Sequence, residues 1–315
     1  MEKPILFAVD GSESCCRSLQ AIGRLLRGNP FSIRLYHCVP NLQALYPGAL
    51  APMTEGDAYL GKLMERAGYA ILEDAGKCLV KNGFPKDLIE YGLKCDSSVP
   101  SCDILNECGE SGVRTVACGR RGKTPKEALL IGSVASRLAQ YSHHRTVWIA
   151  DCLQHETRKA LIAIDGVPDS RALTYYAAEF LAPIPDMHFT LLHLMPIMPA
   201  RFWDHGHILN EREEQEKESS INKWSSENMR DVEQYLHEAR DALIQCGVEA
   251  ERIQVQVKQT SSGVAKDLLN EIDRNKYQLI MLKKKRDPNL QPFLIGSNAN
   301  KILKNAGQTI VCLVD

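Results

Sequence analysis

The 315-residue sequence lacks several features that would assign it to a specialised class of protein. No stretch approaches the ~18 uninterrupted apolar residues of a transmembrane helix, and the apolar run before Asp10 is too short for a signal peptide. Neither sign of charge dominates, because 38 basic residues stand against 39 acidic ones. This balance argues against nucleic acid as a partner. We therefore expect a cytoplasmic globular protein that binds neither a membrane nor nucleic acid.

Cysteine pairs of the C-x-x-C type, which are typical of zinc sites and dithiol centres, are also absent. The 11 cysteines are scattered, and we interpret most of them as reduced, buried apolar residues. The stretches YSHHR at 141–145 and HGH at 205–207 lack the further ligands that a closed metal site requires. The sequence thus gives no support for a metal site built from protein ligands alone.

What the sequence does contain is an internal repeat. ILFAVDGSES near the start matches ALIAIDGVPD in the second half, and Asp10 is equivalent to Asp165. LYHCVP matches LLHLMP, and LLIGSVASRL matches FLIGSNANKI, which makes Gly132 equivalent to Gly296. Blocks that recur in the same order indicate two copies of one domain.

We place the two copies at 1–151 and 158–315, joined by a connector short enough to keep them in contact. Each copy alternates short β-branched runs with longer segments of helical periodicity, which is typical of parallel strands with right-handed helical crossovers. The expected fold class is α/β, with two tandem domains that each hold a five-stranded, parallel, doubly wound sheet. The expected strands are 4–9, 33–39, 88–93, 115–118, 146–150, 160–164, 188–194, 253–257, 279–282 and 309–314. The expected helices of the first copy are 13–26, 58–82, 101–110 and 133–141.

A long stretch without clear periodicity follows the second strand of each copy, at 41–56 and 197–220. Loops of this length commonly form functional flaps or partner surfaces. Within the second stretch, the charged run at 210–220 is expected to begin a solvated helix.

The stretch CGRRGKTPKEALLIGS contains Gly-Lys-Thr, which also ends the phosphate-binding loop of P-loop NTPases. That loop requires a glycine where this chain has Ala117, and a helix should begin at Lys123, yet Pro125 follows. In addition, the stretch follows the fourth expected strand of its domain and not the first. The sequence therefore disfavours a P-loop NTPase.

A different set of residues in this stretch, Gly119, Gly122, Gly132 and Ser133, has the spacing Gly-x2-Gly-x9-Gly-Ser between a strand and the next helix. Gly119 and Gly122 allow a tight turn that presents backbone N–H groups, because no Cβ obstructs them. Gly132 permits close approach, and Ser133 is expected to cap a helix whose N-terminus attracts phosphate. Taken singly, a Gly-Ser before a helix is often only a cap, and the Asp-Gly after the first strand is often only a turn.

Together with the repeat and the strand order, this signature makes nearly the whole chain resemble a tandem-domain universal stress protein. The resemblance implies a Rossmann-like domain of the adenine-nucleotide alpha-hydrolase-like type, and a first domain that binds ATP with Mg²⁺ or Mn²⁺. It implies that Asp10 lies beside the ribose and the nucleotide-bound cation, and that the backbone of Val39 reads the adenine edge. The implied nucleotide-binding residues are Ala8, Val9, Asp10, Val39, Gly119, Arg120, Gly122, Gly132, Ser133 and Val134.

The same resemblance implies how the domains associate. Members of this family commonly pair domains through their last strands, which here are 146–150 and 309–314. Such pairing would occur either inside one chain, where the tandem replaces a dimer, or between two chains of a homodimer.

The second copy departs from the signature. Lys283 and Arg286 stand where the first copy has glycines, while Asp165 and Gly296-Ser297 persist. Side chains now occupy places that require bare backbone, so the phosphate cradle is expected to be altered or filled. The run KKKR at 283–286 either attracts a different anionic ligand or forms a solvated basic turn, and we favour the second interpretation.

Catalytic machinery is not evident, since neither paired carboxylates nor a Ser-His or Cys-His arrangement can be argued from the sequence. His37 and His193, inside apolar strands, are interpreted as core or rim histidines. The sequence therefore predicts an ATP-binding stress-response or signalling module with an unidentified protein partner and at most weak ATP hydrolysis. Two alternatives stay open: a nucleotide-independent adaptor with vestigial sites, and a slow ATPase.

Overall fold

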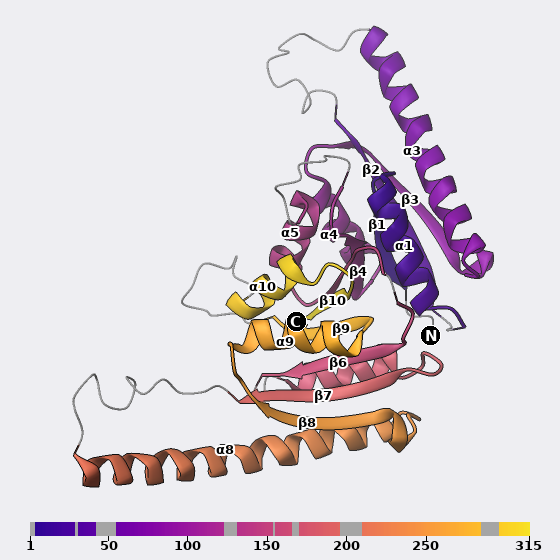
Figure 1. Ribbon diagram of the computed structural model, residues 1–315. Helices are drawn as coiled ribbons and strands as arrows, with labels where there is room; N and C mark the ends of the chain where they lie inside the picture. Colours follow the sequence, from indigo (N-terminus) through magenta and orange to yellow (C-terminus); the bar gives the residue numbers. More distant parts are fainter. Residues whose placement is uncertain are drawn as a thin grey trace.

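The computed structural model describes residues 4–28, 31–41, 55–122, 131–153, 155–165, 170–195, 210–284 and 296–315. Over these residues the chain forms one ten-stranded sheet with the order β3-β2-β1-β4-β5-β10-β9-β6-β7-β8. Two clusters of buried apolar residues lie on the sheet, and helices cover both of its faces (Figure 1). The expected α/β class is confirmed.

The first half supplies five mutually parallel strands: β1 (Ile5–Val9), β2 (Ile33–Pro40), β3 (Ile89–Ser97), β4 (Thr115–Gly119) and β5 (Thr146–Ala150). Its helices are α1 (Glu13–Leu25), α3 (Glu55–Lys81), α4 (Pro100–Glu110) and α5 (Ser133–Tyr141). All of these elements were predicted to within a few residues, because short runs that contain β-branched and other apolar residues alternate with segments of helical periodicity.

The second half repeats the arrangement with β6 (Lys159–Ile164), β7 (His188–Met195), β8 (Ile253–Gln259), β9 (Leu279–Lys283) and β10 (Ile310–Val314). Its helices are α6 (Arg171–Tyr176), which continues into a π-helical turn, α8 (Glu211–Gln245), α9 (Val264–Asn275) and α10 (Ser297–Asn305).

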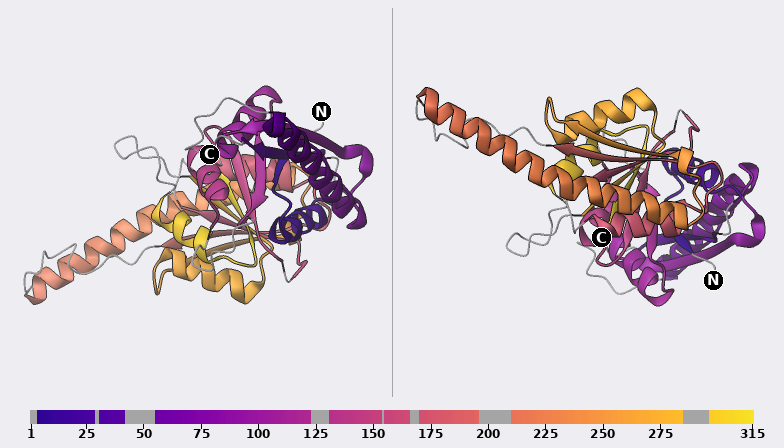
Figure 2. Two further views of the ribbon diagram at one scale, coloured as in Figure 1. Left: turned by 90° about the horizontal axis from the view of Figure 1, so that it is seen from above. Right: turned by 90° about the horizontal axis from the view of Figure 1, so that it is seen from below.

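Helix α8 confirms the expectation of a solvated helix in the charged run. Asn210 accepts hydrogen bonds from the backbone N–H groups of Arg212 and Glu213, and the Glu213 carboxylate accepts one from Asn210 in return. This capping box satisfies N–H groups that would otherwise be unpaired. The helix extends well beyond the sheet (Figure 2). His205 and His207, and most of the 41–56 stretch, lie outside the described residues.

The two halves meet through their last strands. β5 and β10 pair antiparallel, with Val147 opposite Leu313, Trp148 opposite Cys312 and Ile149 opposite Val311. All other neighbouring pairs in the sheet are parallel. The pairing implied for the last strands thus occurs inside one chain.

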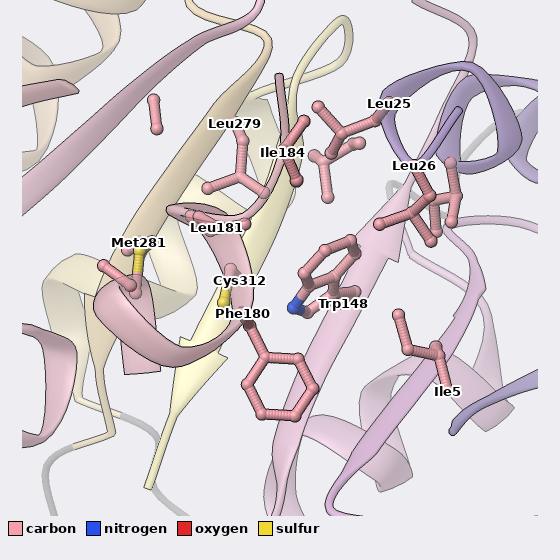
Figure 3. Packing of buried hydrophobic residues seen from close by; sticks show 14 of the residues in the cluster. Ile5, Leu25, Leu26, Trp148, Phe180, Leu181, Ile184, Leu279, Met281 and Cys312 are labelled. Carbon is pink, nitrogen blue, oxygen red and sulfur yellow. The ribbon is translucent and has the colours of Figure 1, made fainter. Parts of the chain in front are cut away.

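The core crosses this junction without a break. Trp148 is fully buried, and it lies among Leu26, Ile184, Leu279 and Cys312, which come from both halves (Figure 3). The apolar cluster to which these residues belong runs from β1 to β10. The two domains therefore share part of one hydrophobic core.

The cysteines are less buried than expected, although all 11 are free. Cys15, Cys108, Cys118 and Cys312 are buried, Cys16, Cys38 and Cys78 are half-buried, and Cys95, Cys102, Cys152 and Cys246 are exposed. The expectation that most are buried is wrong, because sequence spacing does not reveal which face of a short helix such as α4 meets the core.

Candidate functional site

The candidate site of the first domain lies at the carboxyl ends of β1 and β4. The chain leaves β1 towards β2 on one side, while β4 pairs with β1 on the other, so a topological switch point lies between them. Open α/β sheets place ligands in the crevice at such a point. Ala8 pairs with Cys118, which brings Asp10 and the loop after β4 to the same edge of the sheet.

Asp10 is held by the turn that begins α1. The backbone N–H of Ser12 donates to Asp10 Oδ1 at 2.9 Å, and the Ser12 side chain caps α1 by accepting from the N–H of Cys15. Gly11 adopts a φ of +75°, a conformation that favours glycine. These contacts fix the carboxylate of Asp10 at the strand end.

Gly122 lies against this carboxylate, Gly132 lies beside Gly122, and Gly119 ends β4 at the same edge of the sheet. A Cβ added at Gly122 would lie 2.8 Å from Asp10 Oδ2, so only glycine fits there without a shift. Gly132 donates its N–H to the carbonyl of Arg120 at 2.7 Å, and a Cβ on it would lie 3.6 Å from the Gly122 nitrogen. A Cβ at Gly119 would lie 3.2 Å from Ser18 Oγ. Four of the predicted residues, Asp10, Gly119, Gly122 and Gly132, are thus brought together.

Helix α5 begins at this loop, but its cap differs from the expectation. Gly132 is the N-cap, Ser133 is the first helical residue, and no side chain caps the described start of the helix. The expectation that Ser133 caps the helix is therefore wrong: its position is one residue too late. The N-cap Gly132 has no side chain that could accept from the first N–H groups of α5, which suits an anion-binding helix N-terminus. Val134 follows in the first turn and packs on the core.

Val39 and its neighbours form the adjacent part of the edge. The pairing of β2 with β3 shifts register between Cys38 and Pro40, so the buried Val39 lies at an irregularity of the ladder. Such irregularities re-aim residues beside functional sites. Val9 is buried and Ala8 partly buried. The backbone position predicted to read an adenine edge therefore lies where the strand departs from regular pairing.

The two strand histidines have structural partners. His37 Nδ1 lies 2.7 Å from the carbonyl oxygen of Val9, and His193 Nδ1 lies 2.9 Å from that of Ile164. Because a carbonyl only accepts, Nδ1 carries the proton in both cases. Both rings are buried, which confirms their interpretation as core or rim histidines.

Arg120 takes part in the loop only through its backbone. Its N–H donates to the carbonyl of Ala150 at 2.7 Å. Its guanidinium is buried and donates to the carbonyl oxygens of Leu303 and Ala306, in the second domain. Burial lowers the pKa of Arg120, and the nearby Asp151, with 3.5 Å between Nε and Oδ2, opposes that shift.

Two buried thiols lie beneath the Asp10 edge. Cys15 Sγ donates to the carbonyl of Ala8 at 3.8 Å. Burial, and next the negative charge of Asp10, raises the pKa of Cys118 to about 12. Burial first, followed by Asp10, also raises the pKa of Cys15. Both groups therefore remain neutral thiols at physiological pH.

We expect the buried Cys118 and the exposed cysteines to differ in their reactivity towards an alkylating agent. At pH 8 a thiol with a pKa near 12 is ionised in only roughly one molecule in 10⁴, and the thiolate is the reactive form. Iodoacetamide should therefore label exposed Cys102 and Cys152 in the folded chain and leave Cys118 unmodified, as measured by peptide mass mapping. The denatured chain, in which all cysteines should react, is the control. Equal labelling of Cys118 and Cys102 in the folded chain would contradict this arrangement.

The equivalent edge of the second domain carries an open pocket. Its polar lining comes from Asp165 after β6, Lys283 at the end of β9, and Gly296, Ser297 and Asn298 at the start of α10. The apolar lining residues are Ala163, Ile164, Leu192, Leu194, Val264, Leu268, Leu282 and Ala299. The cradle was expected to be altered or filled, and among the described residues the pocket with Lys283 in its lining agrees with an altered one.

The interpretation of the KKKR run as a solvated basic turn is wrong for Lys284, which is buried. Its Nζ donates to the carbonyl of Ser142 at 3.0 Å and to that of Arg145 at 3.2 Å, both in the first domain. Lys283 is half-buried at the pocket, and Arg286 lies outside the described residues.

The sequence analysis did not predict that the side chains of Arg120 and Lys284 extend across the domain boundary. A signal was present, because both copies place a basic residue at the same position, 164 residues apart. The pattern does not say where a long side chain points.

In the part of the chain that the structure describes, no cluster of three or more His, Cys, Asp or Glu residues could hold a metal ion. Among the helices of that same part, none is long and apolar enough to cross a membrane.

The comparisons with known proteins agree with this architecture. A model of the universal stress protein family matches residues 1–149 and again 156–313. The universal stress protein YxiE of Bacillus subtilis (strain 168) is 23% identical over 145 residues, which cover 45% of this chain and 95% of that protein.

Two solved structures are similar over almost the full length. A universal stress protein from Archaeoglobus fulgidus DSM 4304 matches with a TM-score of 0.59 and 14% identity, covering 99% of this chain and 96% of its own. A protein of unknown function from Pseudomonas aeruginosa PAO1 matches with a TM-score of 0.60 and 12% identity, covering 99% and 92%. At these identities the likeness shows the fold alone.

The fold and the two edges define a tandem, doubly wound α/β protein with a candidate site at each switch point. The chain belongs to the universal stress protein family, and its two family domains lie in tandem.

Proposed function

We propose that the first domain holds ATP and that its occupancy makes the chain a nucleotide-dependent stress-response or signalling module. The observation that carries this proposal is the packing of Gly122 against the Asp10 carboxylate, where a single added Cβ would meet Oδ2, with Gly132 beside Gly122 at the start of α5. The start of α5, where the N-cap Gly132 has no side chain to accept from the first N–H groups, suits the phosphates. Val39, at the ladder irregularity, suits the adenine edge.

Asp10 is the residue that would hold a Mg²⁺ or Mn²⁺ ion accompanying the phosphates. A carboxylate is a preferred ligand of such hard cations, and one or two carboxylates plus phosphate oxygens commonly suffice. The ion would neutralise phosphate charge. Among the described residues at this edge, Ser12 orients the Asp10 carboxylate, and His37 is tied to a backbone carbonyl. This arrangement favours holding a nucleotide over hydrolysing it.

Calorimetric titration of the purified chain with ATP and Mg²⁺ tests the proposal. We expect binding by the wild-type chain and a loss of roughly 10- to 100-fold in affinity in Asp10→Asn, because a hydrogen bond or ion contact to a charged group contributes about 1.5–3 kcal/mol. Asp231→Asn, an equal change at an exposed position of α8, is the matched control. No heat with the wild-type chain would contradict ATP binding and favour the nucleotide-independent adaptor.

Phosphate release, measured in parallel, separates binding from catalysis. We expect release no faster than from a heat-denatured control. Steady release that Asp10→Asn abolishes would instead favour the slow ATPase.

A second candidate function rests on the pocket of the second domain. Its apolar walls, together with Lys283 and the start of α10, suit an anion that carries an apolar or aromatic body. Lys283 occupies the position of Gly119, so this pocket would select a different ligand from the first domain's. Native mass spectrometry of the purified chain tests this, and Lys283→Met should lose any anionic ligand that co-purifies.

A further inference from the structure

Two buried cations cross the boundary between the domains. Arg120, the residue after Gly119, is 2% exposed and donates to the carbonyls of Leu303 and Ala306 at the end of α10. Lys284, the residue after Lys283, is 5% exposed and donates to the carbonyls of Ser142 and Arg145 just past the end of α5, and to the Ser142 hydroxyl. Each cation therefore binds the C-terminal end of a helix that belongs to the other domain.

The two contacts are equivalent by the internal symmetry of the chain. The N–H of Arg120 donates to Ala150, the last residue of β5, and the N–H of Lys284 donates to Val314, the last residue of β10, both at 2.7 Å. The antiparallel pairing of β5 with β10 turns one domain against the other, so each basic side chain meets the opposite helix. The contact between a buried cation of one domain and a helix end of the other is therefore present in two equivalent copies.

Both contacts would be costly to break. A buried cation is costly unless its donors are paired, and the unsatisfied carbonyls at a helix C-terminus carry the negative end of the helix dipole. Arg120 has a further partner in buried Asp151. Displacing either helix end would leave a buried charge with fewer acceptors, so helix and cation are expected to move together.

The helices held in this way begin at the two candidate sites. Helix α5 starts at Gly132 in the first site, and helix α10 starts at Gly296 in the second. Each has nine residues and is thus about 13 Å long. Its N-terminus lies at its own domain's site, while its C-terminus is held by a residue adjoining the other domain's loop.

We propose that Arg120 and Lys284 are positioning residues that couple the two sites across the domain boundary. ATP bound beside Asp10 and Gly122 acts on α10 through Arg120. A ligand bound in the pocket beside Lys283 acts on α5 through Lys284. Coupling of this kind is reciprocal, and it typically changes affinity by about 5- to 150-fold. The proposal rests on the ATP site assigned to the first domain and specifies its regulation.

The affinity of the full-length chain for ATP and Mg²⁺, measured by calorimetry, tests the coupling through a residue remote from the nucleotide. We expect Lys284→Met to weaken binding at the first domain at least fivefold, and Lys284→Arg to restore it to within about twofold of wild type, because the Arg guanidinium also carries a positive charge and N–H donors for the carbonyls. Lys301→Met, at an exposed position of α10, is the matched control and should leave affinity unchanged.

Ser142→Ala tests the same contact if the Lys284→Met chain fails to fold, because it removes only one hydrogen-bond acceptor of Lys284. We expect a smaller loss, of about two- to threefold, and an unchanged circular dichroism spectrum.

Hydrogen exchange gives a readout that a purely structural role would not produce. Saturating ATP should slow amide exchange at 300–306, the end of α10, in the wild-type chain but not in Arg120→Met. Unchanged ATP affinity in folded Lys284→Met, or no slowing at 300–306 in the wild type, would overturn the coupling alone. A wild-type chain that binds no ATP would overturn the proposed function and the coupling with it.

Discussion

Replacing Gly122 by Val should abolish measurable ATP binding while leaving the fold intact. The added Cβ would lie 2.8 Å from Asp10 Oδ2, and the two further methyl groups of Val enlarge the clash. The carboxylate must then move from the position that Ser12 fixes, and the loop loses its open backbone. We expect a loss of at least roughly 100-fold in affinity, equal to ~2.7 kcal/mol, by calorimetric titration. Gly122 does not have a positive φ, so Val there does not meet the strain of the left-handed region.

Gly61→Val is the matched control, because it adds the same atoms inside α3 where nothing lies within 4 Å of a new Cβ. Val also has a better helix propensity than Gly, so this variant should be no less stable than the wild type. ATP affinity close to wild type in Gly122→Val would contradict the assignment of the glycine loop as the phosphate site.

Replacing Trp148 by Ala should lower the free energy of unfolding of the whole chain by about 3–5 kcal/mol. Trp148 is fully buried on β5 and contributes to a core that residues of both halves form (Figure 3). Its removal leaves a large cavity at the junction of β5 and β10. Chemical denaturation followed by circular dichroism measures the effect.

Tyr175→Ala, which truncates an aromatic residue that is 68% exposed, should change stability by no more than about 0.5 kcal/mol. Because the core is shared, we expect one cooperative transition in which both domains unfold together. Separate transitions of the two halves, with only one shifted by Trp148→Ala, would show that the junction does not couple their folding.

The candidate site in the first domain was predictable because its residues are encoded locally. Asp10 directly follows a β-branched run, and Gly119 and Gly132 bracket a strand end and a helix start. Parallel strands that follow the right-handed crossover rule bring these segments to one edge. The cap of α5 was misassigned by one residue, since a Gly-Ser pair allows either residue to be the cap.

The second domain was less predictable. Loss of the glycines indicated a changed site, but whether Lys283 fills the cradle or lines an open pocket depends on its rotamer and on α9, which supplies Val264 and Leu268. The degree of burial of the cysteines and of Lys284 was also misjudged. Burial depends on which neighbouring element covers a residue, and the local sequence does not contain that element.

The sequence by itself determined the repeat, the succession of strands and helices along each domain and the residues of the glycine signature, because periodicity and turn chemistry act over a few neighbouring residues. Only the tertiary structure decided that Arg120 and Lys284 point into the opposite domain. Long side chains have many rotamers of similar energy, and the choice is made by carbonyl acceptors more than 130 residues away, at Ala306 and Ser142. Those acceptors come within reach once β5 and β10 have paired.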